Sequence, residues 1–185
     1  MSKNNKQVAV IGSANLEDTQ LKKTCIRLGE TLADNGYSLV CGGLGGVMEF
    51  TCKGFKASVC SIGVTIGILP SYEHADANPF IDVVIPTGLD IGRNQLVVAS
   101  GFAVIVFGGG AGTLSELALA SQMNKPIILF KGSGGWADKL SEEYLDQRKN
   151  SKIYHAHSID DINILLEKLA CEAGKTGVIN SGHNR

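Results

Sequence analysis

The chain has 185 residues, of which 44% are hydrophobic and 19% charged, and its formal net charge is −1 at pH 7. This length suits one domain with a hydrophobic core, and the near-neutral charge gives no electrostatic footprint for nucleic acid or an anionic membrane. We therefore expect neither as a partner. The N-terminus has no apolar signal core and no apolar run approaches 18 residues, so we expect a cytoplasmic protein.

Short apolar runs alternate with amphipathic segments along the chain. The runs predict six strands and a weaker seventh, at Val8–Ile11, Tyr37–Cys41, Val64–Leu69, Val83–Ile85, Phe102–Phe107, Ile127–Phe130 and Ile153–Tyr154. Apolar residues at helical spacing predict helices near 17–34, 47–57, 91–100, 113–123, 136–146 and 159–171.

Strands that are apolar on both faces and alternate with helices are typical of a parallel sheet covered on both sides. The sequence predicts a Rossmann-like, doubly wound α/β fold with a mainly parallel sheet of six to seven strands. It also predicts a single domain over residues 1–173 and a flexible tail over 174–185. The five cysteines form no Cys-x-x-Cys pair, which favours reduced, mostly buried thiols and no metal site.

Four predicted strand ends carry residues suited to ligand binding, and open α/β sheets bind ligands beyond the carboxyl ends of their strands. These ends begin at Gly12, Gly42, Pro86 and Gly108. Two of them are glycine-rich turns between a strand and a helix, which packing alone does not readily explain. The residues that we predict to bind ligand there are Gly12, Ser13, Gly42, Gly43, Gly46, Arg93, Asn94, Gly109, Gly110, Gly112 and Thr113.

The turn after the fifth strand is the most informative. Three consecutive glycines end the strand, and Thr113 is predicted to begin the next helix. Glycines let backbone N–H groups approach a ligand, and a helix N-terminus adds partial positive charge. We predict that Thr113 and the Gly110 and Gly112 amides bind a phosphate. The first turn lacks the Gly-x-Gly-x-x-Gly pattern of dinucleotide sites, so NAD is not expected.

Two charged residues near these turns each have two interpretations. Thr113-Leu-Ser-Glu116 matches a capping box, in which Glu116 reaches back to the cap amide. Alternatively, Glu116 lies at the pocket edge and contacts a sugar or a leaving base, since a carboxylate repels phosphate. Arg93 falls in the first turn of a helix that Asp90 is predicted to cap, where a cation opposes the helix dipole. This placement favours an Arg93 side chain that faces an anion.

Gly109-Gly-Ala-Gly-Thr-Leu-Ser-Glu116 resembles the Gly-Gly-x-Gly-Thr-x-x-Glu signature of the Lonely Guy proteins, formerly described as lysine decarboxylases. That resemblance implies a phosphoribohydrolase that releases cytokinin bases, with Arg93 and Glu116 at the matching catalytic positions. Two departures stand out. Gly108 replaces the usual proline, and Asp90-Ile-Gly-Arg-Asn94 lacks the Met, His and Lys of the family's Met-His-x-Arg-Lys motif.

The chain is more similar to the related molybdenum cofactor carrier group, near the Smf/DNA-processing proteins. The resemblance runs from Val8 to about Leu140, and the shared segments are Gly42–Glu49, Ile66–Pro70, Ala77–Pro79, Ile85–Leu89 with Arg93-Asn94, Gly108–Glu116 and Gly134–Trp136. It implies a small phosphate-bearing ligand and a homodimer or homotetramer.

Two functions follow from these resemblances. The first, which we favour narrowly, is a carrier that binds molybdenum cofactor through its phosphate. The second is a hydrolase that cleaves the N-glycosidic bond of a nucleoside 5′-monophosphate, in which Arg93 positions the leaving base and Glu116 orients the ribose hydroxyls or water. Whether the chain is an enzyme stays open at this point. No cofactor is expected to be required; the expected ligand is molybdenum cofactor or a nucleoside monophosphate.

Overall fold

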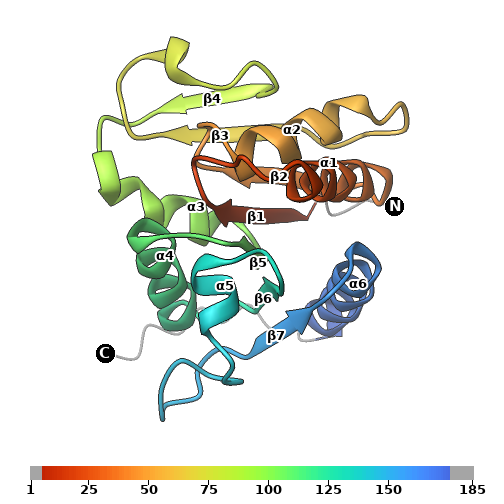
Figure 1. Ribbon diagram of the computed structural model, residues 1–185, viewed down its shortest axis with the longest axis vertical. Coiled ribbons are helices and arrows are strands. Elements are labelled where there is room, and N and C mark those ends of the chain that lie inside the picture. The colour runs from red at the N-terminus through yellow and green to blue at the C-terminus, as the bar shows by residue number, and fades with distance from the viewer. Residues whose placement is uncertain (1–5, 176–185) are drawn as a thin grey trace.

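The computed structural model describes residues 6–175, which form seven strands, six α-helices and two short 3₁₀ helices, η1 and η2 (Figure 1). The strands are β1 (Gln7–Gly12), β2 (Ser38–Cys41), β3 (Thr65–Leu69), β4 (Val83–Pro86), β5 (Ala103–Phe107), β6 (Ile127–Phe130) and β7 (Ile153–Ala156). The helices are α1 (Thr19–Asp34), α2 (Val47–Ala57), η1 (His74–Asp76), η2 (Asp90–Arg93), α3 (Asn94–Ser100), α4 (Ala111–Gln122), α5 (Gly135–Lys139) and α6 (Ile159–Lys175).

All seven strands belong to one sheet in the order β4-β3-β2-β1-β5-β6-β7, and every neighbouring pair is parallel. The predicted Rossmann-like α/β fold is confirmed, including the seventh strand. Each residue of β5 is buried, as expected for a strand that has a layer of helices on both sides.

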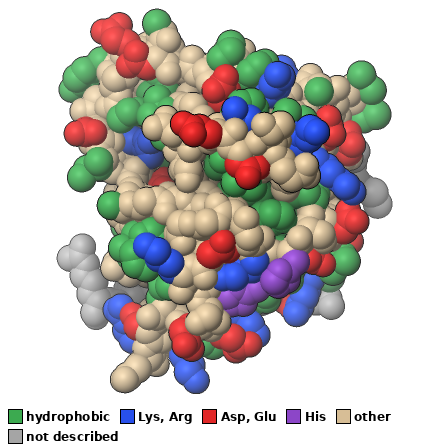
Figure 2. Space-filling view, in the orientation of Figure 1, with side chains coloured by type: hydrophobic (Ala, Val, Ile, Leu, Met, Phe, Trp, Pro, Cys, Tyr) green, Lys and Arg blue, Asp and Glu red, His purple; other side chains and the backbone are tan. Residues whose placement is uncertain are grey.

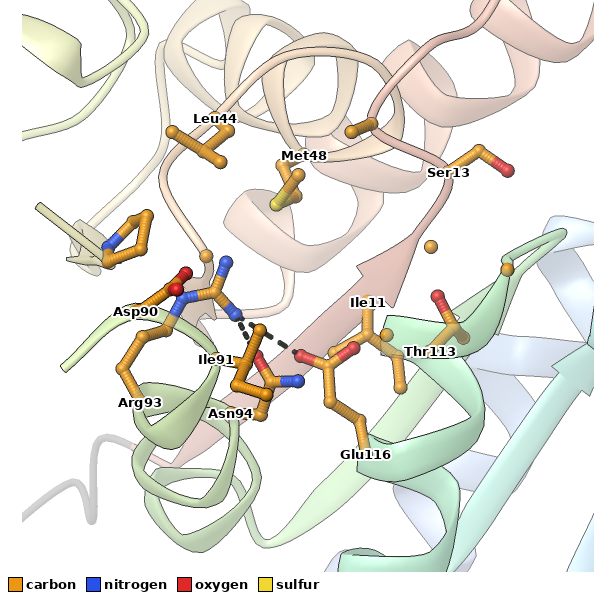
Figure 3. Close-up of a pocket in the computed structure, with 16 residues that line it drawn as sticks. Ile11, Ser13, Leu44, Met48, Asp90, Ile91, Arg93, Asn94, Thr113 and Glu116 are labelled. Atoms are coloured by element: carbon orange, nitrogen blue, oxygen red, sulfur yellow. Dashed lines mark hydrogen bonds and ion pairs between the residues drawn. The ribbon is translucent and has the colours of Figure 1, made fainter.

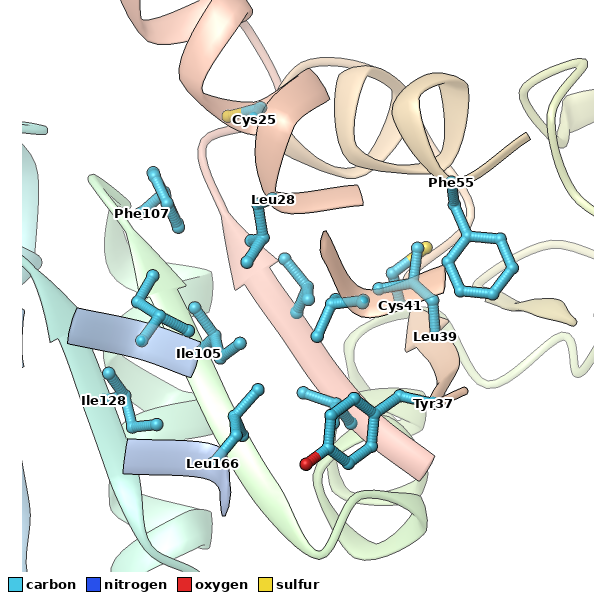
Figure 4. Close-up of a cluster of buried hydrophobic side chains, with 14 of the residues drawn as sticks. Cys25, Leu28, Tyr37, Leu39, Cys41, Phe55, Ile105, Phe107, Ile128 and Leu166 are labelled. Atoms are coloured by element: carbon cyan, nitrogen blue, oxygen red, sulfur yellow. The ribbon is translucent and has the colours of Figure 1, made fainter. Parts of the chain in front are cut away.

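Two separate hydrophobic clusters cover the two faces of the sheet. On one face, α1, α2 and α6 pack against β1, β2 and β5, and Leu28, Leu39, Phe55 and Leu166 are among the buried residues (Figure 4). On the other face, α3, α4 and α5 supply Val97, Val98, Leu117, Ala120 and Ala137. Side chains that alternate along a strand therefore enter different cores.

The order of the strands reverses direction between β1 and β5. From β1 the chain adds strands on one side as far as β4, then crosses back through η2 and α3 to place β5 against the other side of β1. Gly12 at the end of β1 pairs with Phe107 at the end of β5. A crevice at such a switch point is the usual place for a ligand in this fold class.

Two predicted helix boundaries were wrong. The helix predicted over 136–146 is only Gly135–Lys139, because the Glu143 carbonyl accepts the Ile153 N–H at 2.7 Å and so joins the following segment to β7. The helix predicted over 91–100 is preceded by a 3₁₀ turn at 90–93, and α3 begins at Asn94. The predicted tail, 174–185, overlaps the last two residues of α6; the rest of it lies outside the described residues, and its flexibility stays a prediction.

Lysine, arginine and acidic side chains are interspersed over the face drawn in Figure 2. None of the helices within residues 6–175 has both the length and the hydrophobicity needed to cross a membrane.

Candidate functional site

A cavity of about 390 Å³ opens at the carboxyl ends of the strands (Figure 3). It lies where the β1, β2 and β5 turns meet η2 and α4. The residues that line it are Ile11, Gly12, Ser13, Ala14, Gly42, Leu44, Met48, Pro70, Asp90, Ile91, Arg93, Asn94, Gly110, Gly112, Thr113 and Glu116.

The N-terminus of α4 forms one end of this cavity. Gly110 is the N-cap residue, and no side chain accepts a hydrogen bond at this helix start. The first N–H groups of an α-helix have no partner within the helix. A Cβ atom added to Gly110 or Gly112 would meet no atom within 4 Å, so both residues border open space. These amides and the helix dipole form a site suited to an anion.

The predicted capping box was wrong. The helix begins at Ala111, two residues before Thr113, because Ala111 and Gly112 adopt helical geometry and Gly110 takes the cap position. Thr113 is therefore the third helical residue, and its side chain cannot cap. Glu116 lies in the second turn, where its carboxylate reaches Arg93. The alternative interpretation, with Glu116 at the cavity, is the one that the geometry supports.

Hydrogen bonds from two neighbouring loops fix the conformation of the glycine turn. The Gly109 N–H donates to Ser13 Oγ at 3.0 Å, and the Gly108 N–H donates to Ser133 Oγ at 2.8 Å. On the carbonyl side, Gly109 O accepts the Trp136 N–H at 3.1 Å. The Gly109 amide that we predicted to bind ligand is thus already used within the protein, whereas the amides after it are not held by a side-chain cap.

Arg93 and Glu116 form a buried ion pair at the centre of the cavity wall. Arg93 Nη1 lies 3.6 Å from Glu116 Oε1, and the two side chains are only 11% and 8% exposed. Arg93 Nη1 also donates to Asn94 Oδ1 at 2.5 Å, and Asn94 Nδ2 donates to Ser115 Oγ at 2.9 Å. Arg93 Nε is buried without a hydrogen-bond partner among the described residues. Such a donor is an exception among buried polar groups, most of which are hydrogen-bonded.

The predicted cap by Asp90 was wrong as well. Arg93 is the residue that precedes α3, and Asp90 is the first residue of η2, with a left-handed φ of +48°. Its backbone N–H donates to Pro70 O at 3.0 Å, which anchors this turn to the end of β3. Arg93 is therefore not placed in the first turn of an α-helix, but its side chain does enter the cavity.

Burial raises the pKa of Glu116 from its usual 4.5 to about 7, and the Arg93 charge opposes that rise. The carboxyl group thus exchanges its proton close to neutral pH. A group of this kind in a cavity can either orient a ligand by hydrogen bonds or exchange a proton with one.

The family model for the SLOG cluster4 family matches residues 5–163. The chain belongs to this family. Among solved structures, this SLOG cluster4 protein is similar to the molybdenum cofactor binding protein of Rippkaea orientalis, with 34% identity, a TM-score of 0.78, and 91% of this chain and 99% of that one covered. It is also similar to the molybdenum cofactor carrier protein of Chlamydomonas reinhardtii, with 26% identity, a TM-score of 0.75, and coverage of 90% and 99%.

A relative named for a different activity is the cytokinin riboside 5′-monophosphate phosphoribohydrolase of Mycobacterium tuberculosis. It is 31% identical over 149 residues, which cover 72% of this chain and 78% of that protein. The chain is thus similar both to molybdenum cofactor carriers and to a phosphoribohydrolase, as the sequence predicted. Similarity alone does not distinguish a carrier from a hydrolase, so the distinction depends on the residues of the site.

The cavity brings together most of the predicted site residues of this SLOG cluster4 protein. Gly12, Ser13, Gly42, Arg93, Asn94, Gly110, Gly112, Thr113 and Glu116 line it, whereas Gly43, Gly46 and Gly109 do not. Sequence reasoning missed the apolar wall formed by Ile11, Ala14, Leu44, Met48, Pro70 and Ile91, and missed Asp90 as a lining residue. Leu44 lies within the glycine turn after β2 and Met48 follows it, so their position next to predicted site residues was the available signal.

Proposed function

We propose that this protein binds molybdenum cofactor, a phosphate-bearing pterin, and carries it. The observation that carries this proposal is the open N-terminus of α4 at one end of a cavity whose remaining wall is largely apolar. A ligand that combines a phosphate with a flat ring needs an anion site next to an apolar surface.

The phosphate would lie at the amides that follow Gly110. There the helix dipole and unpaired N–H groups favour negative charge, and glycine leaves room for an oxygen to approach. The hydroxyl of Thr113, which lines the same end, would add a donor. The buried Arg93, which lines the same cavity, contributes positive charge that Glu116 does not offset when that carboxyl is protonated.

The ring system would lie against the apolar wall. Leu44 and Pro70 come from the turns after β2 and β3, Met48 from the first turn of α2, and Ile11 from the end of β1. A methionine thioether packs well against the edge or face of an aromatic ring. A cavity of about 390 Å³ falls in the size range of small-molecule sites.

The test compares Gly112→Asp with Gly112→Asn. The Cβ of either residue enters open space, and aspartate near a helix N-terminus favours the helix, so both variants are expected to fold. The aspartate carboxylate would repel a phosphate at that position, while asparagine has the same shape without the charge. We expect Asp, and not Asn, to lower the affinity for molybdenum cofactor about 100-fold, measured by fluorescence titration. Equal affinity for both variants would contradict the phosphate position.

Mass spectrometry of the ligand retained by the wild-type protein, purified from cells that make molybdenum cofactor, provides the direct test. A pterin phosphate that co-purifies with wild type and is absent from Gly112→Asp supports the proposal. Retention of a nucleotide in its place would overturn the choice of pterin. The homodimer or homotetramer expected from the family resemblance stays a prediction, to be measured by light scattering.

The Arg93–Glu116 pair favours one alternative, hydrolysis of a nucleoside 5′-monophosphate. Both side chains lie in the cavity, and the pKa of Glu116 is near 7. With the phosphate at α4, Arg93 would position the leaving base, and the Glu116 carboxylate would orient the ribose hydroxyls or the attacking water and stabilise developing positive charge on the sugar.

Incubation with AMP and analysis for free adenine and ribose 5-phosphate tests this alternative. If the protein is a hydrolase, Glu116→Gln should lower kcat by a factor of about 100 or more and leave the fold intact. Wild-type protein that binds AMP without releasing adenine would exclude adenine nucleotides as hydrolysis substrates. Turnover that depends on Glu116 would exclude a pure carrier.

A further inference from the structure

We infer that Asp90 and Arg93 together select the organic part of the ligand and favour a 2-amino-4-oxo ring, as in a pterin or guanine, over a 6-amino ring such as adenine. This inference rests on the proposed function because it needs a phosphate-bearing ligand in the same cavity. It assigns a specificity role to Asp90, one of the lining residues that sequence reasoning missed.

The local backbone places these two side chains on one side of the cavity. Asp90 and Arg93 are the first and last residues of η2. Both line the cavity, and Figure 3 shows them across it from Thr113. A ligand whose phosphate binds at α4 would therefore bring its ring towards η2.

The Asp90 carboxylate is available to a ligand. No hydrogen bond or ion pair engages it within residues 6–175, since Arg93 pairs with Glu116 instead. The residue also has a φ of +48°, a left-handed conformation that is uncommon outside glycine, although asparagine and aspartate adopt it more often than most residues. Backbone strain of this kind occurs preferentially at functional sites. Here the Pro70 carbonyl holds the strained turn through the Asp90 N–H.

The two side chains present complementary hydrogen-bonding groups. A carboxylate only accepts, and an arginine only donates. The edge of a pterin or guanine ring carries two adjacent donors, the ring N–H and the 2-amino group, beside a carbonyl oxygen. The Asp90 carboxylate can accept both donors in a bidentate arrangement, and the Arg93 guanidinium, which lines the same cavity, can donate to the carbonyl.

Adenine presents the opposite pattern on the corresponding edge. Its amino group would face the Arg93 donors, and its unprotonated ring nitrogen would face the Asp90 carboxylate. Two donors or two acceptors would then meet with no hydrogen bond between them. Sites built to hydrogen-bond a ligand discriminate strongly against analogues that leave their polar groups unpaired.

The test uses GMP and AMP, which share ribose and phosphate and differ only in the base, with ribose 5-phosphate as the probe for the shared part. Binding is measured by calorimetry at pH 7.5, with chromatography to verify that the nucleotides stay intact. We expect wild type to bind GMP about 10- to 100-fold more tightly than AMP, the effect of one or two charge-assisted hydrogen bonds. Neopterin phosphate should likewise bind more tightly than AMP.

Asp90→Asn and Asp90→Gly are the matched variants. Asparagine preserves the shape and tolerates a positive φ, and glycine adopts that backbone freely, so both are expected to fold. Both should bring the GMP and AMP affinities to within about threefold of each other and leave the affinity for ribose 5-phosphate unchanged.

Each outcome has a distinct meaning. Equal affinity of wild type for GMP and AMP, or a preference that survives in both variants, overturns the role of Asp90 and leaves the phosphate site standing. Failure of wild type to bind ribose 5-phosphate, either nucleotide and neopterin phosphate overturns the proposed function, and this inference with it. A preference for GMP that both variants lose supports it.

Discussion

The two glycine-rich turns look alike in the sequence but differ in what surrounds their glycines. In the turn after β2, a Cβ atom on Gly46 would lie 2.2 Å from Ser13 O, and one on Gly43 would lie 2.6 Å from a Leu69 methyl carbon. In the turn after β5, a Cβ atom on Gly110 or Gly112 would meet nothing within 4 Å.

This difference distinguishes glycines that are needed for close packing from glycines that leave room for a ligand. The first turn uses glycine so that two backbone segments can approach closely, and both Gly43 and Gly46 have positive φ angles of +74° and +64°. In the turn after β5, Gly108 and Gly109 likewise have positive φ angles and close protein neighbours, but Gly110 and Gly112 leave space beside the α4 N-terminus. A glycine-rich motif therefore predicts a special backbone, and only its surroundings tell whether a ligand or the protein itself occupies the space.

The largest expected difference in stability is between two variants that each replace one glycine by alanine, one variant for each turn. Gly46→Ala introduces both a strained φ and a clash with a backbone carbonyl, so we expect it to lower the free energy of unfolding by about 3 kcal/mol or more. Gly112→Ala, inside a helix and facing open space, should raise it by up to about 1 kcal/mol. Denaturant titration of both variants gives the comparison. Equal destabilisation by the two substitutions would contradict it.

A second prediction concerns Glu116, in the helix that follows the β5 turn, and the pH dependence of stability that it causes. The pKa of Glu116 is raised in the folded state, so the native protein binds this proton more tightly than the unfolded chain does. The resulting stabilisation is complete below about pH 4.5 and disappears as the pH rises through about 7. Relative to Glu116→Gln, wild type should lose about 3 kcal/mol of unfolding free energy between pH 4.5 and pH 8.

Unfolding curves of wild type and Glu116→Gln at several pH values measure this difference directly. Other carboxyl groups titrate equally in both proteins and cancel. A constant difference between the two proteins across this range would show that Glu116 is ionised in the folded state throughout.

The smallest expected effect concerns Ser13, which contacts both turns. Ser13→Ala removes the acceptor of the Gly109 N–H and should lower the unfolding free energy by about 1 kcal/mol. It should also weaken phosphate binding, because Gly109 precedes the helix start that forms the anion site. Ser100→Ala, which removes a hydroxyl that bonds only within α3, is the matched control. Equal effects of the two variants on phosphate affinity would exclude a positioning role for Ser13.

The strands and their parallel arrangement could be predicted because their residues are apolar on both faces and alternate with helical patterns. The run Ala103–Phe107 is an example: five buried residues in a row exclude a half-exposed strand. The positions of the candidate ligand-binding turns could be predicted as well, since strand ends in this fold class converge on one edge of the sheet.

The helix starts and the partners of charged side chains could not be predicted in the same way. Thr113 and Glu116 fit a capping box by spacing, but the structure starts the helix at Ala111 and pairs Glu116 with Arg93, a residue 23 positions away. That pair depends on how η2 and α4 pack together. The left-handed backbone of Asp90 likewise depends on the Pro70 carbonyl, which no local pattern indicates.

Ser13 links the start of α2 to the turn that precedes α4. Its carbonyl accepts the Val47 N–H at the start of α2, and its hydroxyl accepts the Gly109 N–H before α4. A displacement of either helix start is therefore transmitted to the other through a single residue. A ligand that displaces the start of one helix should therefore displace the start of the other as well.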